Sequence, residues 1–136
     1  GTLIRPPAGI NAGADETRYL FGNIRSHLKE RFRSIRLGWL NHKFGGEWTF
    51  PAVTESAKES QRCGIRNVVY FPFGFVADNG ESQLEGKRQL AEFGWNDVLY
   101  LPCLNDSEDF IQLKAMRVLE RIGEVGPKAT KHKDNC

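Results

Sequence analysis

The sequence has no long hydrophobic run and no recognisable targeting segment. None of its apolar stretches approaches the roughly 20 residues that a membrane-spanning helix needs, and its start does not follow the signal-peptide pattern. With 40% hydrophobic and 26% charged residues in 136, the composition is typical of one globular domain. We therefore expect a cytoplasmic protein whose contact with membranes is at most peripheral. Because the chain begins with Gly1, we also expect it to derive from something longer.

Cysteine is scarce and charge is nearly balanced. The three cysteines, Cys63, Cys103 and Cys136, form no C-x-x-C pair and match no zinc-site spacing, so we expect free thiols in a reducing compartment. Cys63 and Cys103 lie in apolar surroundings, which predicts small core residues. The net charge of +2 is small and the basic residues do not cluster outside the tail, so no nucleic-acid partner is expected.

Short apolar segments alternate with helical patterns along the chain. The apolar segments are rich in β-branched and aromatic residues, as buried parallel strands are. This order predicts an α/β fold, a three-layer sandwich with a short parallel sheet of three to four strands flanked by helices. Residues 1–125 would form this domain and residues 126–136 a disordered basic tail. The predicted strands span residues 35–40, 67–73 and 98–102, and the predicted helices span 15–33, 51–63, 80–93 and 106–123.

Four acidic residues recur in the third predicted helix. At about 100° per residue, Asp78, Glu81, Glu85 and Glu92 fall within about 60° of arc. Like charges at this spacing repel, so the row could serve to receive a divalent cation or protons. Alternatively, Asp78 and Glu81 are simply stabilised by the positive N-terminal end of the helix dipole, and Glu85 and Glu92 lie on a solvated face. The residues alone favour this second interpretation without excluding the first.

The segment 41–50 follows the first predicted strand and contains two large aromatics. Trp48 and Phe50 could form an apolar wall for a flat ligand, or could simply pack beneath the loop. The glycine pair at 45–46 matches neither the P-loop nor the dinucleotide fingerprint. His42 is interpreted as a surface histidine and His27 as a structural one.

Three blocks, in order, resemble one family. Residues 71–82 (FPFGFVADNGES) resemble the ferrochelatase segment P-x-x-F-x-S-D-x-x-E-T, and residues 101–110 (LPCLNDSEDF) resemble the proline- and asparagine-containing loop ahead of that family's last helix. Residues 48–51 (WTFP) resemble its W-L-x-P turn. By these blocks the chain is identified as a member of the ferrochelatase family, within the chelatase-like superfamily, and as its carboxyl-terminal half.

The resemblance implies roles for individual residues. Glu81 matches the catalytic glutamate, and Glu85 matches the next acid along the same helix. Asn79 stands where many members have histidine, and Ala77 replaces the usual serine. The implied assignments are Asp78 and Glu81 to catalysis, Glu81 and Glu85 to the metal, and Trp48, Asn79 and Phe75 to substrate binding.

The resemblance also implies a reaction and its partners. The family inserts ferrous iron into a porphyrin in heme biosynthesis, in a cleft between two α/β halves, so an amino-terminal chelatase half and a porphyrin are the expected partners. Fe²⁺ is then a substrate, and no permanently bound cofactor is expected. An iron–sulfur cluster is not expected, because Cys136 is the one cysteine in the tail. A homodimer is compatible with the sequence.

The essential histidine of the family lies in an S-x-H-G-x-P type motif, which would fall just ahead of Gly1. None of His27, His42 and His132 occupies its place, so this chain alone is expected to be inactive. Two other functions are retained: a small sirohydrochlorin-type chelatase, and a tetrapyrrole-binding module that has lost the reaction. An unrelated flavodoxin-like binding domain is a further, fold-level alternative.

Overall fold

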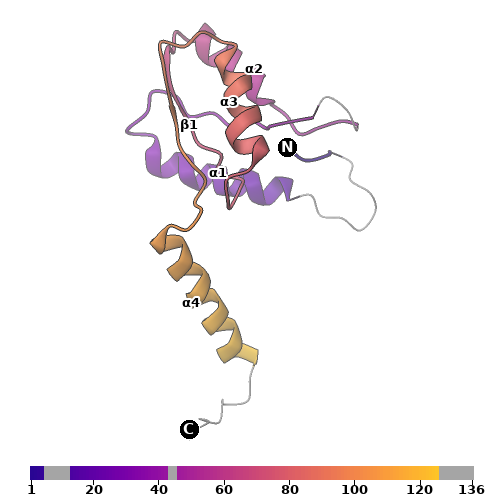
Figure 1. Ribbon diagram of the computed structural model, residues 1–136, viewed down its shortest axis with the longest axis vertical. Helices are drawn as coiled ribbons and strands as arrows, with labels where there is room; N and C mark the ends of the chain where they lie inside the picture. The colour runs from indigo at the N-terminus through magenta and orange to yellow at the C-terminus, as the bar shows by residue number, and fades with distance from the viewer. Residues whose placement is uncertain (5–12, 43–45, 126–136) are drawn as a thin grey trace, which may run out of the picture.

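A computed structural model describes residues 1–4, 13–42 and 46–125 of the protein. Helices and short strands alternate along it, which confirms the predicted α/β class (Figure 1). The predicted tail, 126–136, lies outside the described residues. In chain order the elements are α1 (Ala14–Leu28), α2 (Val53–Arg62), β1 (Asn67–Tyr70), the π-helix η1 (Glu81–Glu85), α3 (Gly86–Ala91), β2 (Asp97–Tyr100) and α4 (Glu108–Val125).

The sheet of the described chain is smaller than predicted. It consists of β1 and β2, which pair in parallel with Asn67 opposite Asp97 and Tyr70 opposite Tyr100. Among the described residues, the sheet thus has fewer strands than the three to four predicted. Side chains alternate along each strand: Tyr70 is buried in the core, whereas Val69 and Leu99 are exposed on the other face.

Residues 35–40 were predicted as a strand, yet they bond to the start of α2 instead. The Trp39 N–H donates to the Pro51 carbonyl, and the Val53 N–H donates to the Trp39 carbonyl. Gly38 permits this approach, because a Cβ there would lie 2.8 Å from the Cα of Val53. With its backbone groups used in this way, the segment forms an isolated bridge and no sheet strand.

The core lies between α2, β1, α3 and the segment before α2. Phe75 and the aromatic residues at 93, 95 and 100 pack around it. Gly86 is required at the start of α3, because a side chain there would overlap the Tyr70 hydroxyl. The buried cluster consists of Leu40, Val53, Ala57, Tyr70 and Leu90.

The last helix, α4, covers most of the predicted range 106–123. Figure 1 shows α4 extending away from the other elements, and its apolar residues are exposed, Val118 and Leu119 among them. The helix continues past Gly123, which was predicted to end it. Within the described residues, no helix combines the length and apolarity needed to cross a bilayer.

The two described cysteines have different environments. Cys103 is buried, at 4% exposure, as predicted. The same prediction for Cys63 is wrong, because Cys63 caps the end of α2 and is exposed. Its Sγ accepts a hydrogen bond from the Arg36 guanidinium at 3.3 Å.

Candidate functional site

The acidic segment 78–92 does not form one regular helix. Residues 81–85 form the π-helix η1, and α3 follows from Gly86. The Asn79 Oδ1 atom accepts hydrogen bonds from the N–H groups of Glu81 and Ser82, at 2.9 and 3.0 Å, and so satisfies two donors at the start of η1. Wide helical turns of this kind are frequent at functional sites. The side-chain directions therefore differ from those expected for an α-helix.

Asp78 lies before η1 and faces the turn at 103–105. Its Oδ1 accepts from the Cys103 N–H at 2.8 Å and from Gln83 Nε2 at 2.6 Å, and its Oδ2 accepts from Asn105 Nδ2 at 3.0 Å. The Asp78 N–H in turn donates to Asn105 Oδ1 at 2.8 Å. The Cys103 backbone donor, followed by the Asn105 amide, lowers the pKa of Asp78 to about 2. Asp78 thus ties two loops together and stays ionised.

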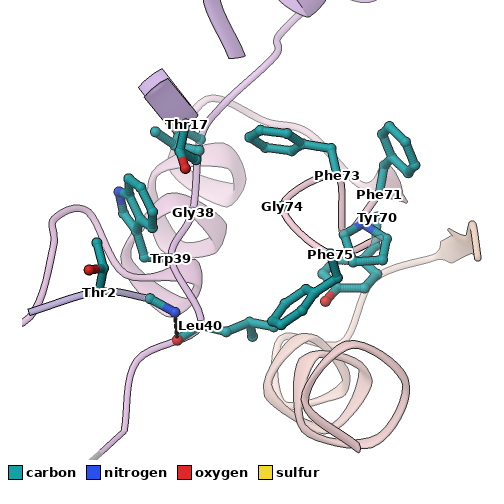
Figure 2. Close-up of a pocket in the computed structure, with 13 residues that line it drawn as sticks. Thr2, Thr17, Gly38, Trp39, Leu40, Tyr70, Phe71, Phe73, Gly74 and Phe75 are labelled. Carbon is teal, nitrogen blue, oxygen red and sulfur yellow. Dashed lines mark hydrogen bonds between the residues drawn. The ribbon is translucent and has the colours of Figure 1, made fainter. Parts of the chain in front are cut away.

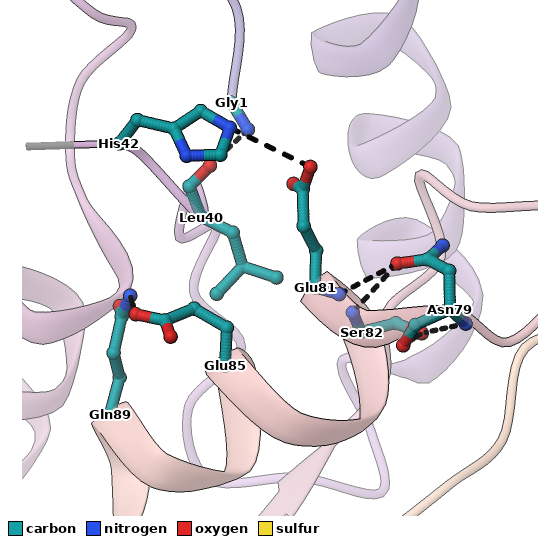
Figure 3. Close-up of polar contacts among 8 residues, drawn as sticks. All are labelled: Gly1, Leu40, His42, Asn79, Glu81, Ser82, Glu85 and Gln89. Carbon is teal, nitrogen blue, oxygen red and sulfur yellow. Dashed lines mark hydrogen bonds and ion pairs between the residues drawn. The ribbon is translucent and has the colours of Figure 1, made fainter. Parts of the chain in front are cut away.

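Glu81 has a different environment. Its Oε1 lies 3.6 Å from His42 Nε2, and both side chains are partly exposed. The His42 ring meets Trp48 edge to face, with 5.2 Å between ring centroids. Figure 3 shows His42 and Glu81 pointing toward one another from the loop and from η1. Three residues from two distant parts of the chain are therefore brought together here.

Glu85 points elsewhere. Arg88 Nη2 donates to both of its carboxylate oxygens at 2.9 Å, and Gln89 Nε2 donates to Oε1 at 3.0 Å. In Figure 3 its carboxylate is turned toward Gln89 and away from the Glu81 carboxylate. The row of acids expected from α-helical spacing is thus not formed. The carboxylates at 78, 81 and 85 point in different directions, and each has a different set of partners.

An aromatic pocket opens between residues 37–40 and the turn that follows β1 (Figure 2). Its volume is about 220 Å³. Leu40 borders both this pocket and the Glu81 side chain, as Figures 2 and 3 show together. The larger lining side chains are those of Trp39, Leu40, Tyr70, Phe71, Phe73 and Phe75.

Helix α1 closes one side of the pocket. The Arg18 guanidinium lies over the Trp39 ring, 5.8 Å from its centroid, and Phe21 contacts Phe73 with 6.3 Å between centroids. These contacts hold α1 against the turn after β1. The pocket walls are therefore built by four separate segments of the chain, residues 1–2, Thr17 of α1, 37–40 and 70–75.

Two polar atoms of the pocket residues have no hydrogen-bond partner among the described residues. They are Trp39 Nε1 and the Tyr70 hydroxyl, and both are buried. Burial raises the pKa of Tyr70 to about 12, so the phenol stays neutral. Buried donors without partners are rare in folded proteins and point to an additional polar group when they occur.

The structure distributes the predicted site residues over different surroundings. Phe75 lines the pocket, Trp48 packs beside His42 outside it, and Asn79 caps η1. Phe50, considered as a pocket wall, is exposed. His42 beside Glu81 is a contact that sequence reasoning missed, since no local pattern links the two residues. No group of three or more His, Cys, Asp or Glu side chains able to hold a metal occurs in residues 1–4, 13–42 and 46–125.

Comparisons with known proteins agree on one family. The family model described as Ferrochelatase matches residues 14–122. The chain is 36% identical over 85 residues to a ferrochelatase of Brucella ovis, covering 59% of this chain and 23% of the relative. It is 31% identical over 100 residues to one of Chelativorans sp., covering 64% and 27%, and 34% identical over 85 residues to one of Rhizobium etli, covering 59% and 23%.

These alignments span about a quarter of the length of the curated relatives. No solved structure matches the chain. The family match covers both loops that meet at Asp78, the π-helix with Glu81 and most of the pocket. This chain belongs to the ferrochelatase family.

Proposed function

We propose that the protein inserts ferrous iron into a porphyrin in heme biosynthesis, and that this chain supplies the carboxyl-terminal half of the active site. The observation that carries the proposal is the position of Glu81. Its partly exposed side chain lies beside Leu40, a residue that lines the aromatic pocket. The family membership supports the same reaction, since the relatives named above are ferrochelatases.

The pocket supplies the apolar surface that a flat macrocycle needs. Phe71, Phe73 and Phe75 present rings from one short turn, opposite Trp39. Aromatic walls of this kind bind planar ligands through their faces and exclude water. At about 220 Å³ the pocket is smaller than the roughly 300–1,000 Å³ of typical ligand sites. In the proposal, an amino-terminal half supplies the opposite wall, and this chain alone does not turn over.

Metal insertion requires two pyrrole protons to leave the macrocycle. Glu81 is the acceptor in the proposal, because its partly exposed side chain lies beside Leu40, which lines the pocket, and beside His42. Asp78 is a poor base with a pKa of about 2, so its part is to fix the loop that leads into η1. In the proposal, Glu85 is the next proton acceptor along the same helix.

The proposal is tested by Glu81→Gln in the full-length protein. Glutamine keeps the shape of the side chain and removes the charge that accepts a proton. Metal insertion, followed by porphyrin absorbance under anaerobic Fe²⁺, should fall by orders of magnitude, on the scale of about 10²–10⁴ for a lost general base. Porphyrin binding, followed by quenching of tryptophan fluorescence, should be retained.

Glu92→Gln provides the matched control, because it makes the same change at the C-terminal end of α3. That variant should insert metal at the wild-type rate. Undiminished turnover by Glu81→Gln would remove Glu81 from the mechanism. A wild-type protein that binds porphyrin tightly and inserts no metal would favour the tetrapyrrole-binding module instead.

A further inference from the structure

One face of α1 turns toward the aromatic pocket and carries two arginines. Phe21 on this face contacts Phe73, a pocket residue, with 6.3 Å between ring centroids. Residues three and four apart on a helix share a face, so Arg18 and Arg25 lie on the same side of α1 as Phe21. The position of Arg18 agrees with this, because its guanidinium lies 5.8 Å from the centroid of the Trp39 ring. Two cations therefore flank Phe21 on the side of α1 that meets the pocket.

Neither guanidinium is held by a strong ion pair. Arg18 pairs with Asp15 at 3.3 Å, but the Asp15 side chain is 98% exposed, and exposed pairs contribute little to stability. Arg25 has no acidic partner among the residues that the structure describes. It lies in the last turn of α1, where the helix dipole also favours a cation. Both side chains can therefore bind an anionic ligand without breaking a buried contact.

We infer that Arg18 and Arg25 bind carboxylate side chains of the planar ligand whose ring lies against the aromatic wall. The inference rests on the proposed function and narrows its substrate class to macrocycles with anionic substituents. A guanidinium binds a carboxylate through two parallel N–H···O bonds, which fix the orientation of the ligand as well as its affinity. Seven residues at about 1.5 Å each place the two Cα atoms about 10 Å apart along the helix axis, so each cation can hold its own carboxylate.

The pocket itself explains why anionic groups would need partners on α1. Among the described residues that line the pocket, none has an acidic or basic side chain, and the larger ones are apolar or aromatic. These walls suit a flat ring, but they would leave ionised substituents of that ring without a partner. Arg18 can supply the partner while it stays hydrated, since its side chain is 48% exposed. The arrangement thus suits an apolar ring that carries carboxylates on its rim.

The test compares deuteroporphyrin IX, which has two carboxylates, with its uncharged dimethyl ester. Binding of each to the full-length protein, in the same non-ionic detergent, is followed by quenching of tryptophan fluorescence. Arg18→Met and Arg25→Met each remove one charge and retain an apolar stem that can cover the neighbouring rings. Each should weaken binding of the diacid at least about tenfold, the scale of a hydrogen bond to a charged group, and leave binding of the diester unchanged. Arg25→Lys should recover part of the loss, because lysine keeps the charge and lacks the planar fork.

Arg62→Met is the matched control, since Arg62 on α2 pairs with an acid three residues away, Glu59, as Arg18 does on α1. It should bind both porphyrins as the wild type does. Wild-type affinity for the diacid in both α1 variants overturns the inference. An equal loss for diacid and diester also overturns it, because the arginines would then act through packing. If those variants bind the diacid normally while Glu81→Gln abolishes metal insertion, the carboxylate site fails and the proposed function stands. A wild-type protein that binds neither porphyrin rejects the two together.

Discussion

Asp78 and Glu81 are three residues apart, carry the same charge and have opposite surroundings. Asp78 accepts hydrogen bonds from Cys103, Asn105 and Gln83, and every one of these partners fixes the backbone around it. Glu81 has His42 at 3.6 Å and interacts electrostatically with the Gly1 ammonium, and its side chain is partly exposed. A carboxylate that is saturated with donors is a structural element, whereas one that is left open can exchange protons or cations.

The two environments come from different parts of the chain. The turn at 103–105 reaches Asp78 because β2 ends beside β1, and Asn105 adopts a left-handed backbone with φ 49° that presents its amide. His42, from the segment after residues 37–40, lies close to Glu81. Asp78 lies before η1 and Glu81 is its first residue, so each acid meets its own neighbours. Substitutions that disturb the surroundings of one acid and leave those of the other intact can therefore test this comparison of Asp78 with Glu81.

The largest effect is expected at Gly86, which follows η1 directly. A Cβ there would lie 2.7 Å from Tyr70 Cζ and would overlap the hydroxyl. Gly86→Ala should therefore destabilise the protein by about 1–3 kcal/mol, as overpacked cores do. Because Gly86 adjoins η1, the change should shift Glu81 and leave the Asp78 contacts intact. The free energy of unfolding in urea measures the effect.

Gly22→Ala is the matched control in α1, where an added Cβ would meet no atom within 4 Å. That variant should gain about 0.5–1 kcal/mol, as alanine does over glycine inside a helix. Adding Tyr70→Phe to Gly86→Ala removes the overlapping hydroxyl and should recover part of the loss. Equal stability of Gly86→Ala and wild type would show that the Tyr70 contact does not position η1.

A smaller effect is expected from the charge of Asp78, because the side chain is exposed and water partly replaces its partners. Its pKa of about 2 lies below the ordinary 3.8, so its stabilisation is fully present above about 3.8 and is lost as the pH falls through about 2. The urea midpoint of the wild type should thus decline over this window more steeply than that of Asp78→Asn.

Asp15→Asn, at the exposed start of α1, removes one carboxylate of the same kind and serves as the charge-matched control. Its midpoint should follow the wild-type pH profile. Parallel pH profiles for Asp78→Asn and the wild type would show that the hydrogen bonds at Asp78 do not stabilise the folded state. Asp78 would then have to be reconsidered as a group open to chemistry.

Local sequence patterns predicted the helices and strands whose formation depends mainly on neighbouring residues. The helix predicted over 106–123 is found as α4, and the strand predicted over 67–73 is found as β1. Gly64 and Gly94, which follow their helices, have positive φ, a conformation that glycine adopts readily. The motif blocks led to the family because they match whole segments, which the family comparison confirmed.

Contacts between distant segments were outside the reach of these patterns. Residues 35–40 are apolar enough for a strand, but Trp39 bonds to Pro51 and Val53 and so leaves the sheet. The hydrogen bonds of Asn79 and the close approach of Tyr70 to Gly86 occur at the two ends of η1, and neither follows from α-helical spacing. The pairing of His42 with Glu81 likewise depends on how two loops meet.

The smallest effect is expected at Glu85, the third acid of the segment, whose pair with Arg88 is 39% and 65% exposed. Exposed ion pairs three residues apart on a helix contribute about 0.3–0.5 kcal/mol. Arg88→Ala should thus lower the free energy of unfolding by no more than about 0.5 kcal/mol, and the difference should vanish in 1 M NaCl, where the Debye length is about 3 Å. A loss above 1 kcal/mol, or one that persists in high salt, would place Glu85 with Asp78 as a structural acid. A small, salt-sensitive loss would identify the pair as an ordinary exposed ion pair with little structural role.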